Sequence, residues 1–205
     1  GGQWAALRDS SEEGVALAVS IGQKGLPAAP AAWLTLLSAL QGRPDYADRL
    51  AALEELLTAH PLVGIFAQPV EDLTRWAKGV HAALAGSPSD ALHHFRHMQR
   101  PTLTLIAAQD TIDAATQSGD TRQARVWVDQ LEGFAAGTHL AWAQSAAAFG
   151  RAITAAHNDV ADEDTVGGLF ETSLAHHANA NRPYDRARVQ LAYGQFLRRS
   201  QRRVD

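Results

Sequence analysis

Apolar residues along this chain recur every three or four positions rather than at every second one. One stripe consists of Leu50, Leu53, Leu56 and Leu57. Another consists of Val126, Trp127, Leu131 and Phe134. This spacing places the apolar side chains on one face of an α-helix. Alternating runs of β-branched residues, which would indicate strands, are nearly absent. The pattern therefore predicts helices along the chain.

Glycine and proline residues separate the helical segments. They lie at Gly25 to Pro30, Gly42 to Pro44, Pro61, Pro69, Gly86 to Pro88, Pro101, Gly119, Gly137 and Pro183. The intervening segments, of about 10 to 20 residues, leave room for about ten helices joined by short turns. Short turns make successive helices antiparallel. We therefore predict an all-α fold built of helical hairpins.

The hairpins show a weak repeat. Gly79, Gly86, Ala91 and Phe95 have the spacing of the tetratricopeptide repeat at its small and aromatic positions. A small residue lets two helices approach closely, and a glycine between them permits a left-handed turn. Similar turn-then-alanine pairs are Gly42 with Ala47 and Gly119 with Ala124, and further turns are expected near residues 158 and 201. The spacing predicts a single domain, residues 1–205, of degenerate tetratricopeptide-like hairpins in a right-handed superhelix. A non-repetitive helical bundle is the alternative.

Composition excludes several classes of protein. The chain has 205 residues, a formal net charge of −4 and no cysteine, so disulfides and thiolate metal sites are absent. The negative net charge argues against direct nucleic-acid contact by this chain, because binding to phosphates needs clustered Lys and Arg. The only such cluster is Arg198, Arg199, Arg202 and Arg203, which we interpret as a solvated helix face. No apolar run approaches the ~20 residues that span a bilayer, and we expect no secretory signal. We expect a cytoplasmic protein without membrane contact, excised from a longer one.

Histidines raise the question of a metal site. His93, His94 and His97 lie close together in one predicted helix, and His93 and His97 are one turn apart. A catalytic zinc helix, however, needs a glutamate directly after its first histidine, and His94 occupies that position. We predict no metal site here, but a solvated or partly packed histidine face, and interpret His176-His177 in the same way.

The segment from Arg100 to Asp110 resembles the late strand of α/β-hydrolases, which would make Asp110 a catalytic acid. That interpretation needs a G-x-S-x-G nucleophile elbow upstream, and the chain has none. The helical alternative places Pro101 in a first turn, where its missing N–H costs nothing. A long helix ending before Gly119 would then follow. No phosphate-binding G-x-x-x-x-G-K-[ST] loop is present either, and we predict that this chain is not an enzyme.

Two stretches of the C-terminal half carry a family resemblance. The first comprises Pro101, Leu105, the run Asp110-Thr111-Ile112-Asp113-Ala114-Ala115, Gly119-Asp120 and Gln123-Ala124-Arg125. The second comprises Arg182-Pro183-Tyr184-Asp185-Arg186-Ala187-Arg188, Leu191-Ala192-Tyr193-Gly194, Leu197-Arg198-Arg199 and Arg202-Arg203-Val204-Asp205. These residues resemble the helical-repeat region of large ATP-binding LuxR-family transcriptional regulators, just before their DNA-binding domain. The N-terminal half is similar only in its general helical style.

The resemblance implies a function for the chain. Such regulators have an upstream P-loop ATPase, a helical-repeat sensor and a downstream helix-turn-helix. This chain would be the sensor, which recognises a small-molecule inducer or a protein or peptide partner and controls activation or assembly. No cofactor is expected in it, because ATP would bind only to the upstream domain. The alternative is a stand-alone tetratricopeptide-type scaffold for protein–protein interaction. Ala-rich helices of this kind also leave self-association possible.

The repeat phase indicates which residues could line a groove. The predicted ligand- or partner-binding residues are Leu73, Trp76, Gln109, Asp113, Thr116, Gln117, Arg188, Gln195 and Arg198. Leu73 and Trp76 would give an apolar floor, and the other residues would give polar walls. A mixture of that kind suits a small organic molecule or a peptide.

Overall fold

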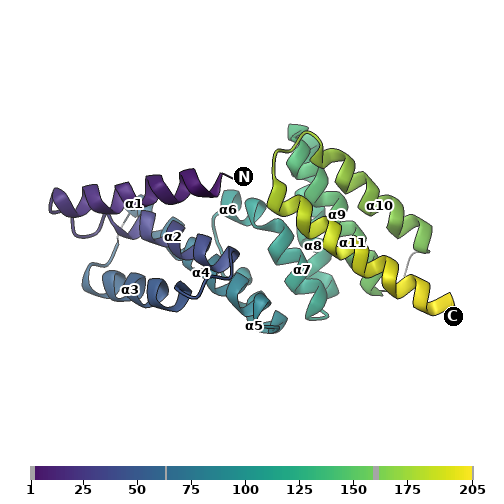
Figure 1. The fold of residues 1–205 in the computed structure, drawn as a ribbon, viewed down its shortest axis with the longest axis horizontal. Helices are drawn as coiled ribbons and strands as arrows, with labels where there is room; N and C mark the ends of the chain where they lie inside the picture. The colour runs from purple at the N-terminus through teal and green to yellow at the C-terminus, as the bar shows by residue number, and fades with distance from the viewer. Residues whose placement is uncertain (1–2, 63, 159–161, 205) are drawn as a thin grey trace. The chain divides into compact units, whose positions relative to one another are not determined.

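The structure is a computed structural model that describes residues 3–62, 64–158 and 162–204. Within these ranges the regular elements are eleven α-helices and one short 3-10 helix, with no strand (Figure 1). The prediction of an all-α fold with about ten helices is confirmed. The α/β-hydrolase alternative is wrong, because it needs a central sheet. None of the described helices combines the length and the apolar character needed to cross a bilayer.

Residue contacts divide the chain into two compact units, which are described separately. The N-terminal unit is Gln3–Ala107, and the C-terminal unit begins at Ala108. The sequence predicted a single repeat domain over residues 1–205, and its superhelical stacking stays a prediction.

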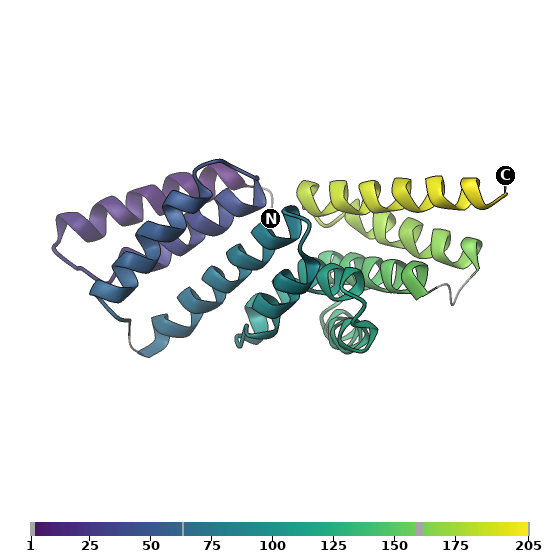
Figure 2. The ribbon, with the colours of Figure 1, turned by 90° about the horizontal axis from the view of Figure 1, so that it is seen from below.

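The N-terminal unit is built of helices that pack mainly against their neighbours in the chain (Figure 2). Its elements are α1 (Trp4–Ser20), α2 (Ala28–Leu40), α3 (Tyr46–Ala59), η1 (Gly64–Phe66), α4 (Ala67–Leu84), α5 (Pro88–Arg96) and α6 (Pro101–Ile106). Helix α2 contacts α1, α3 and α4, and it is apolar on almost every side. A helix that is apolar all round is stable only when it is buried, so α2 forms the centre of this unit.

The α4–α5 hairpin has the close approach that the repeat spacing predicted. Gly79 of α4 lies directly against the ring of Phe95 in α5, which is 1% exposed. A Cβ atom added at Gly79 would lie only 2.3 Å from Cε1 of that ring. Gly86 makes the turn between the helices with a φ of +79°, a conformation that glycine adopts without strain. These two glycines therefore fix the geometry of the hairpin.

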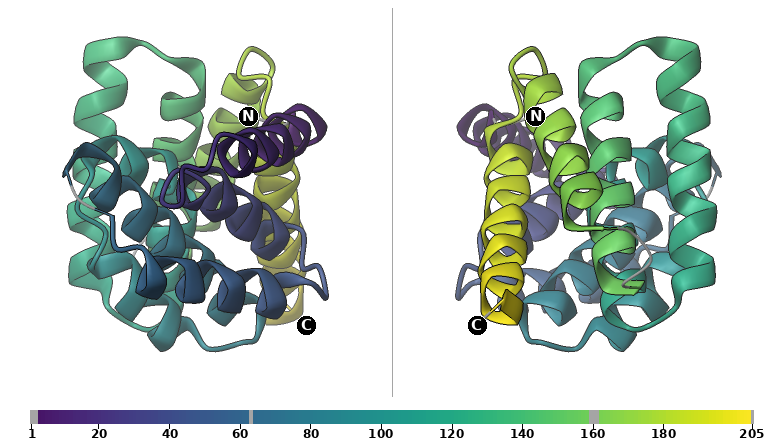
Figure 3. Two further views of the ribbon diagram at one scale, coloured as in Figure 1. Left: turned by 90° about the vertical axis from the view of Figure 1, so that its left-hand side faces the viewer. Right: turned by 90° about the vertical axis from the view of Figure 1, so that its right-hand side faces the viewer.

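The C-terminal unit contains five helices. They are α7 (Ala108–Gln117), α8 (Thr121–Thr138), α9 (Ala141–Asn158), α10 (Glu163–His177) and α11 (Pro183–Val204). Helix α9 contacts α7, α8 and α10, while α11 packs mainly on α10 (Figure 3). Phe170 of α10 lies at the centre of the core, stacked on Tyr193 at 5.1 Å between ring centroids. The carboxylates of Asp120 and Asp162 cap α8 and α10 by accepting backbone N–H hydrogen bonds.

Most of the predicted turns agree with the structure. Gly42 and Gly119 make the α2–α3 and α7–α8 turns with φ values of +59° and +80°. The turn predicted near residue 201 is wrong, because α11 continues through that position to Val204. Near residue 158 helix α9 ends, and residues 159–161 lie outside the described ranges. The break predicted at Gly137 agrees with the α8–α9 turn, where a histidine, His139, adopts the left-handed conformation with a φ of +54°.

The segment after Pro101 is helical, with proline in its first turn as predicted. It is not one long helix, however, because the chain turns at Ala107 between α6 and α7. Neither glycine nor proline marks this break, and the apolar pattern continues across it. Ile112 and Ala115 of α7 are both fully buried, as expected for the core-facing side of that helix.

Candidate functional site

Three of the predicted binding residues meet at one place in the C-terminal unit. Arg188 of α11 donates from Nη1 to Asp110 and from Nη2 to Asp113 Oδ2, the latter over 3.3 Å. Gln117 Nε2 donates to Asp113 Oδ1 over 2.8 Å. The side chain of Arg188 is only 21% exposed. A single guanidinium therefore bridges two carboxylates of α7.

Helix geometry explains why these groups converge. Asp110 and Asp113 are three residues apart in α7, so their side chains lie on the same face. Tyr184 and Arg188 are four residues apart in α11, and the guanidinium lies 5.9 Å from the tyrosine ring centroid. The planar fork of arginine donates in two directions at once, which a lysine could not reproduce.

The start of α11 adds a second set of charges. Arg182 donates to Asp185 over 3.3 Å, and its guanidinium carbon lies 4.2 Å from the ring centroid of Trp142 in α9. Here we call Asp110, Asp113, Gln117, Trp142, Arg182, Tyr184, Asp185 and Arg188 the Arg188 cluster. It holds three carboxylates and two guanidinium groups.

The electrostatics of the Arg188 cluster are strongly coupled. Burial would lower the pKa of Arg188, but the nearby Asp110 and Asp113 outweigh burial and raise it above its ordinary value. Burial raises the pKa of Asp185, with Arg182 opposing the rise and Asp110 adding to it. Arg188 is therefore a permanent cation, and Asp185 takes up a proton more readily than an ordinary aspartate does.

The Arg188 cluster contains no nucleophile–base pair, and its chemical capacity is to hold helices together. It ties α7, the first helix of the unit, to α11, the last one. Buried ion pairs add little net stability, yet losing one partner is costly because the other charge stays buried. An arrangement of this kind favours one position of α11 over others and is sensitive to competing charges.

The other predicted residues do not join this cluster. Leu73 and Trp76 are only 2% and 6% exposed in the core of the N-terminal unit. Gln109 and Thr116 are also buried, at 6% and 3% exposed. The repeat spacing assigned one face of each helix to the groove. Neighbouring helices, however, cover α4 and α7 on more than one side, so the residues on that face are buried. A ligand could reach these four residues only by displacing core packing.

Gln195 and Arg198 are exposed on α11. They are accessible to a ligand or partner, but they lie apart from the Arg188 contacts. A binding role for them stays a prediction.

The histidine pairs differ from one another. The rings of His93 and His97 lie 4.7 Å apart, and His97 Nδ1 forms a hydrogen bond of 2.7 Å with the His93 carbonyl. Within the described ranges, no three His, Asp or Glu side chains are arranged to hold a metal ion. His177, expected on a solvated or partly packed face, is buried at 5% exposed. Burial lowers its pKa, with Asp185 opposing the decrease.

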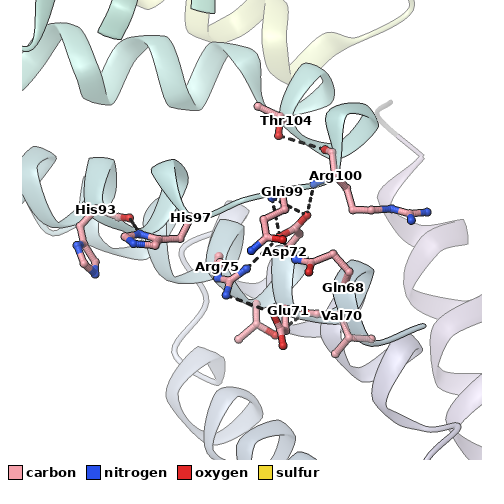
Figure 4. Close-up of polar contacts among 11 residues, drawn as sticks. Gln68, Val70, Glu71, Asp72, Arg75, His93, His97, Gln99, Arg100 and Thr104 are labelled. Atoms are coloured by element: carbon pink, nitrogen blue, oxygen red, sulfur yellow. Dashed lines mark hydrogen bonds and ion pairs between the residues drawn. The ribbon is translucent and has the colours of Figure 1, made fainter. Parts of the chain in front are cut away.

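A buried carboxylate that the sequence pattern did not single out organises the N-terminal unit (Figure 4). Asp72 of α4 is fully buried and accepts hydrogen bonds from the backbone N–H groups of Gln99 and Arg100, the latter at 2.6 Å. The side chains of Gln68 and Arg75 donate to it as well. With its oxygens engaged in this way, Asp72 fixes the α5–α6 connection to α4. Its role is therefore to position the backbone.

Comparison with known proteins adds no relative, since no protein family, no curated protein and no solved structure matches this chain.

Proposed function

We propose that this chain is the ligand- or partner-sensing helical-repeat region of a cytoplasmic LuxR-type transcription regulator. Binding would change how α11 is held and so control activation or assembly of the regulator. One observation supports this proposal above the others. The stretch from Arg182 to Arg188, which carries the resemblance to these regulators, supplies the guanidinium that ties α11 to α7.

The Arg188 cluster gives the proposal a physical mechanism. A ligand or partner that competes for Arg188, or for the carboxylates around it, lowers the free energy needed to move α11. The ligand shifts the equilibrium only by its difference in affinity for the two positions of this helix. Typical coupling of about 1–3 kcal/mol would change the affinity of a distant site roughly 5- to 150-fold.

A thermal-shift screen with sugars, acyl compounds and peptides tests the sensing function. A ligand at 100 times its dissociation constant stabilises the chain by about 2.7 kcal/mol. We expect at least one class to stabilise the protein and to change amide hydrogen exchange in α11. The substitution Arg188→Gln should abolish that exchange response. Arg186→Gln is the matched control, because Arg186 is exposed on the same helix.

Two outcomes would contradict the proposal. One is a chain that no compound class and no protein partner stabilises. The other is an Arg188→Gln variant whose α11 responds to ligand as the Arg186→Gln control does.

A stand-alone scaffold for protein–protein interaction is the second candidate. It is favoured by an open cavity of about 620 Å³ between α3, α4 and α5, which needs no regulator around it. The coding sequence on either side of this chain discriminates between the two. A P-loop upstream and a helix-turn-helix downstream favour the regulator, and their absence favours the scaffold.

A further inference from the structure

A groove lies between α3, α4 and α5 of the N-terminal unit, with a volume of about 620 Å³. Its apolar lining is made of Ala47, Leu50 and Ala51 from α3 and Ala82 from α4. Ala47 and Ala51 are exposed, and Leu50 is half-buried. Three small side chains leave room for another backbone to approach closely.

The groove stays open because α3 packs on α2 and contacts α4 through side chains. The ring of Tyr46 stacks on His81 with centroids 4.2 Å apart, and Glu54 pairs with Lys78 at 2.6 Å. Tyr46 and Glu54 are eight residues apart, or about 12 Å along the helix. Between these two contacts, more than two turns of α3 present an uncovered face. A groove of that length and shape suits a helix.

Charge in the groove comes mainly from Asp90 of α5. Glu54 and Lys78 neutralise each other, whereas no hydrogen bond or ion pair engages the Asp90 carboxylate within the described residues. Burial, with His93 and Lys78 nearby, lowers the pKa of His94 against the opposing effect of Asp90, which disfavours a positive charge on this ring. The unbalanced charge of the groove is therefore negative, and it complements a cation.

We propose that this groove binds an amphipathic helical segment of a protein partner, with small apolar side chains against the alanines and a Lys or Arg against Asp90. The inference rests on the proposed interaction function, but not on the regulator context. A small organic molecule fits this groove less well than a helix does. Pockets for such molecules bury most of the ligand surface, whereas this groove is open. An acidic segment would meet Asp90 without a counter-ion.

The test is a displayed library of helical peptides, selected on the full chain. We expect enrichment of sequences with small apolar residues at helical spacing and a Lys or Arg at one end. Binding of an enriched peptide, measured by fluorescence anisotropy, should weaken at least about tenfold in Ala51→Arg, which fills the groove. Asp90→Asn should weaken it by about the same factor and reduce its salt dependence.

Matched controls for both variants come from α3. Ala52→Arg and Asp48→Asn alter exposed residues of α3 outside the groove lining, and each should bind within about twofold of the wild type. Because residue 51 is exposed, Ala51→Arg should keep the melting temperature of the wild type.

Several results would overturn the inference. They are a selection without enrichment, enrichment of acidic segments, and undiminished binding to Ala51→Arg. Self-association that Ala51→Arg abolishes would identify a second copy of the chain as the occupant instead. If groove binding fails while α11 still responds through Arg188, the inference alone is wrong. The opposite pattern would contradict only the sensing proposal.

Discussion

Replacing Gly79 with alanine tests the packing of the α4–α5 hairpin. Alanine is the better helix former by about 1 kcal/mol, so helix propensity alone predicts that the free energy of unfolding rises by that amount. The new Cβ, however, would lie 2.3 to 2.7 Å from three atoms of the Phe95 ring, against an ordinary carbon–carbon contact of about 3.5–4.0 Å. Because Phe95 is fully buried, its ring has little room to move, and overpacking costs about 3 kcal/mol. The expected net loss of unfolding free energy is about 2 kcal/mol.

Gly14→Ala is the matched control. Gly14 lies inside α1 of the same unit, and an added Cβ would meet Pro30 at 3.5 Å, an ordinary contact. This variant should keep the propensity gain of about 1 kcal/mol, so the two variants should differ by about 3 kcal/mol. Urea denaturation followed by far-ultraviolet circular dichroism measures both.

A double-mutant cycle identifies the cause of the loss. In a Phe95→Leu background the clash is relieved, and Gly79→Ala should then stabilise the protein as Gly14→Ala does. A Gly79→Ala variant as stable as the wild type would refute the reasoning. So would a loss of stability that is the same with Phe or Leu at position 95.

Three further predictions concern charged and titratable groups. Asp72→Ala removes the acceptor of two backbone N–H groups, so the free energy of unfolding should fall by about 3 kcal/mol. Amide hydrogen exchange in the α5–α6 connection should become faster. Arg188→Met leaves two carboxylates without their cation and should cost about 3 kcal/mol in urea denaturation, whereas Arg186→Met should cost less than about 0.5 kcal/mol. Burial lowers the pKa of His177, so the unfolded chain takes up this proton first as the pH falls below about 6.5. The stabilising contribution of neutral His177 is complete above that pH and is lost below it; the melting temperature of wild type should therefore fall more between pH 7 and pH 5 than that of His177→Leu.

Local signals predicted the hairpins well. The spacing of Gly79, Gly86 and Phe95 reports on contacts within one hairpin, where a few residues determine both the turn and the approach of the helices. The break at Ala107 left no such signal, because it contains neither glycine nor proline. The repeat spacing predicted a turn near residue 201, but the long helix α11 continues through that position.

The candidate site could be predicted only in part. Helical periodicity placed Asp113 and Arg188 on polar faces, but their pairing spans 75 residues and depends on how five helices pack. Leu73 and Trp76 show the opposite case, since periodicity identifies an apolar face without telling a groove from a core. Asp72 was missed because its partners are backbone N–H groups 27 and 28 residues further along the chain.

The neighbour-on-neighbour packing of the helices has a consequence for how the protein is made. Contacts that are local in the sequence allow fast folding, because little chain entropy is lost before each contact forms. The N-terminal unit is complete at Ala107, so it can fold while the rest of the chain is still being synthesised. The bond between Asp110 and Arg188 spans 78 residues and must wait for α11. Docking of α11 is therefore expected to follow the folding of the N-terminal unit.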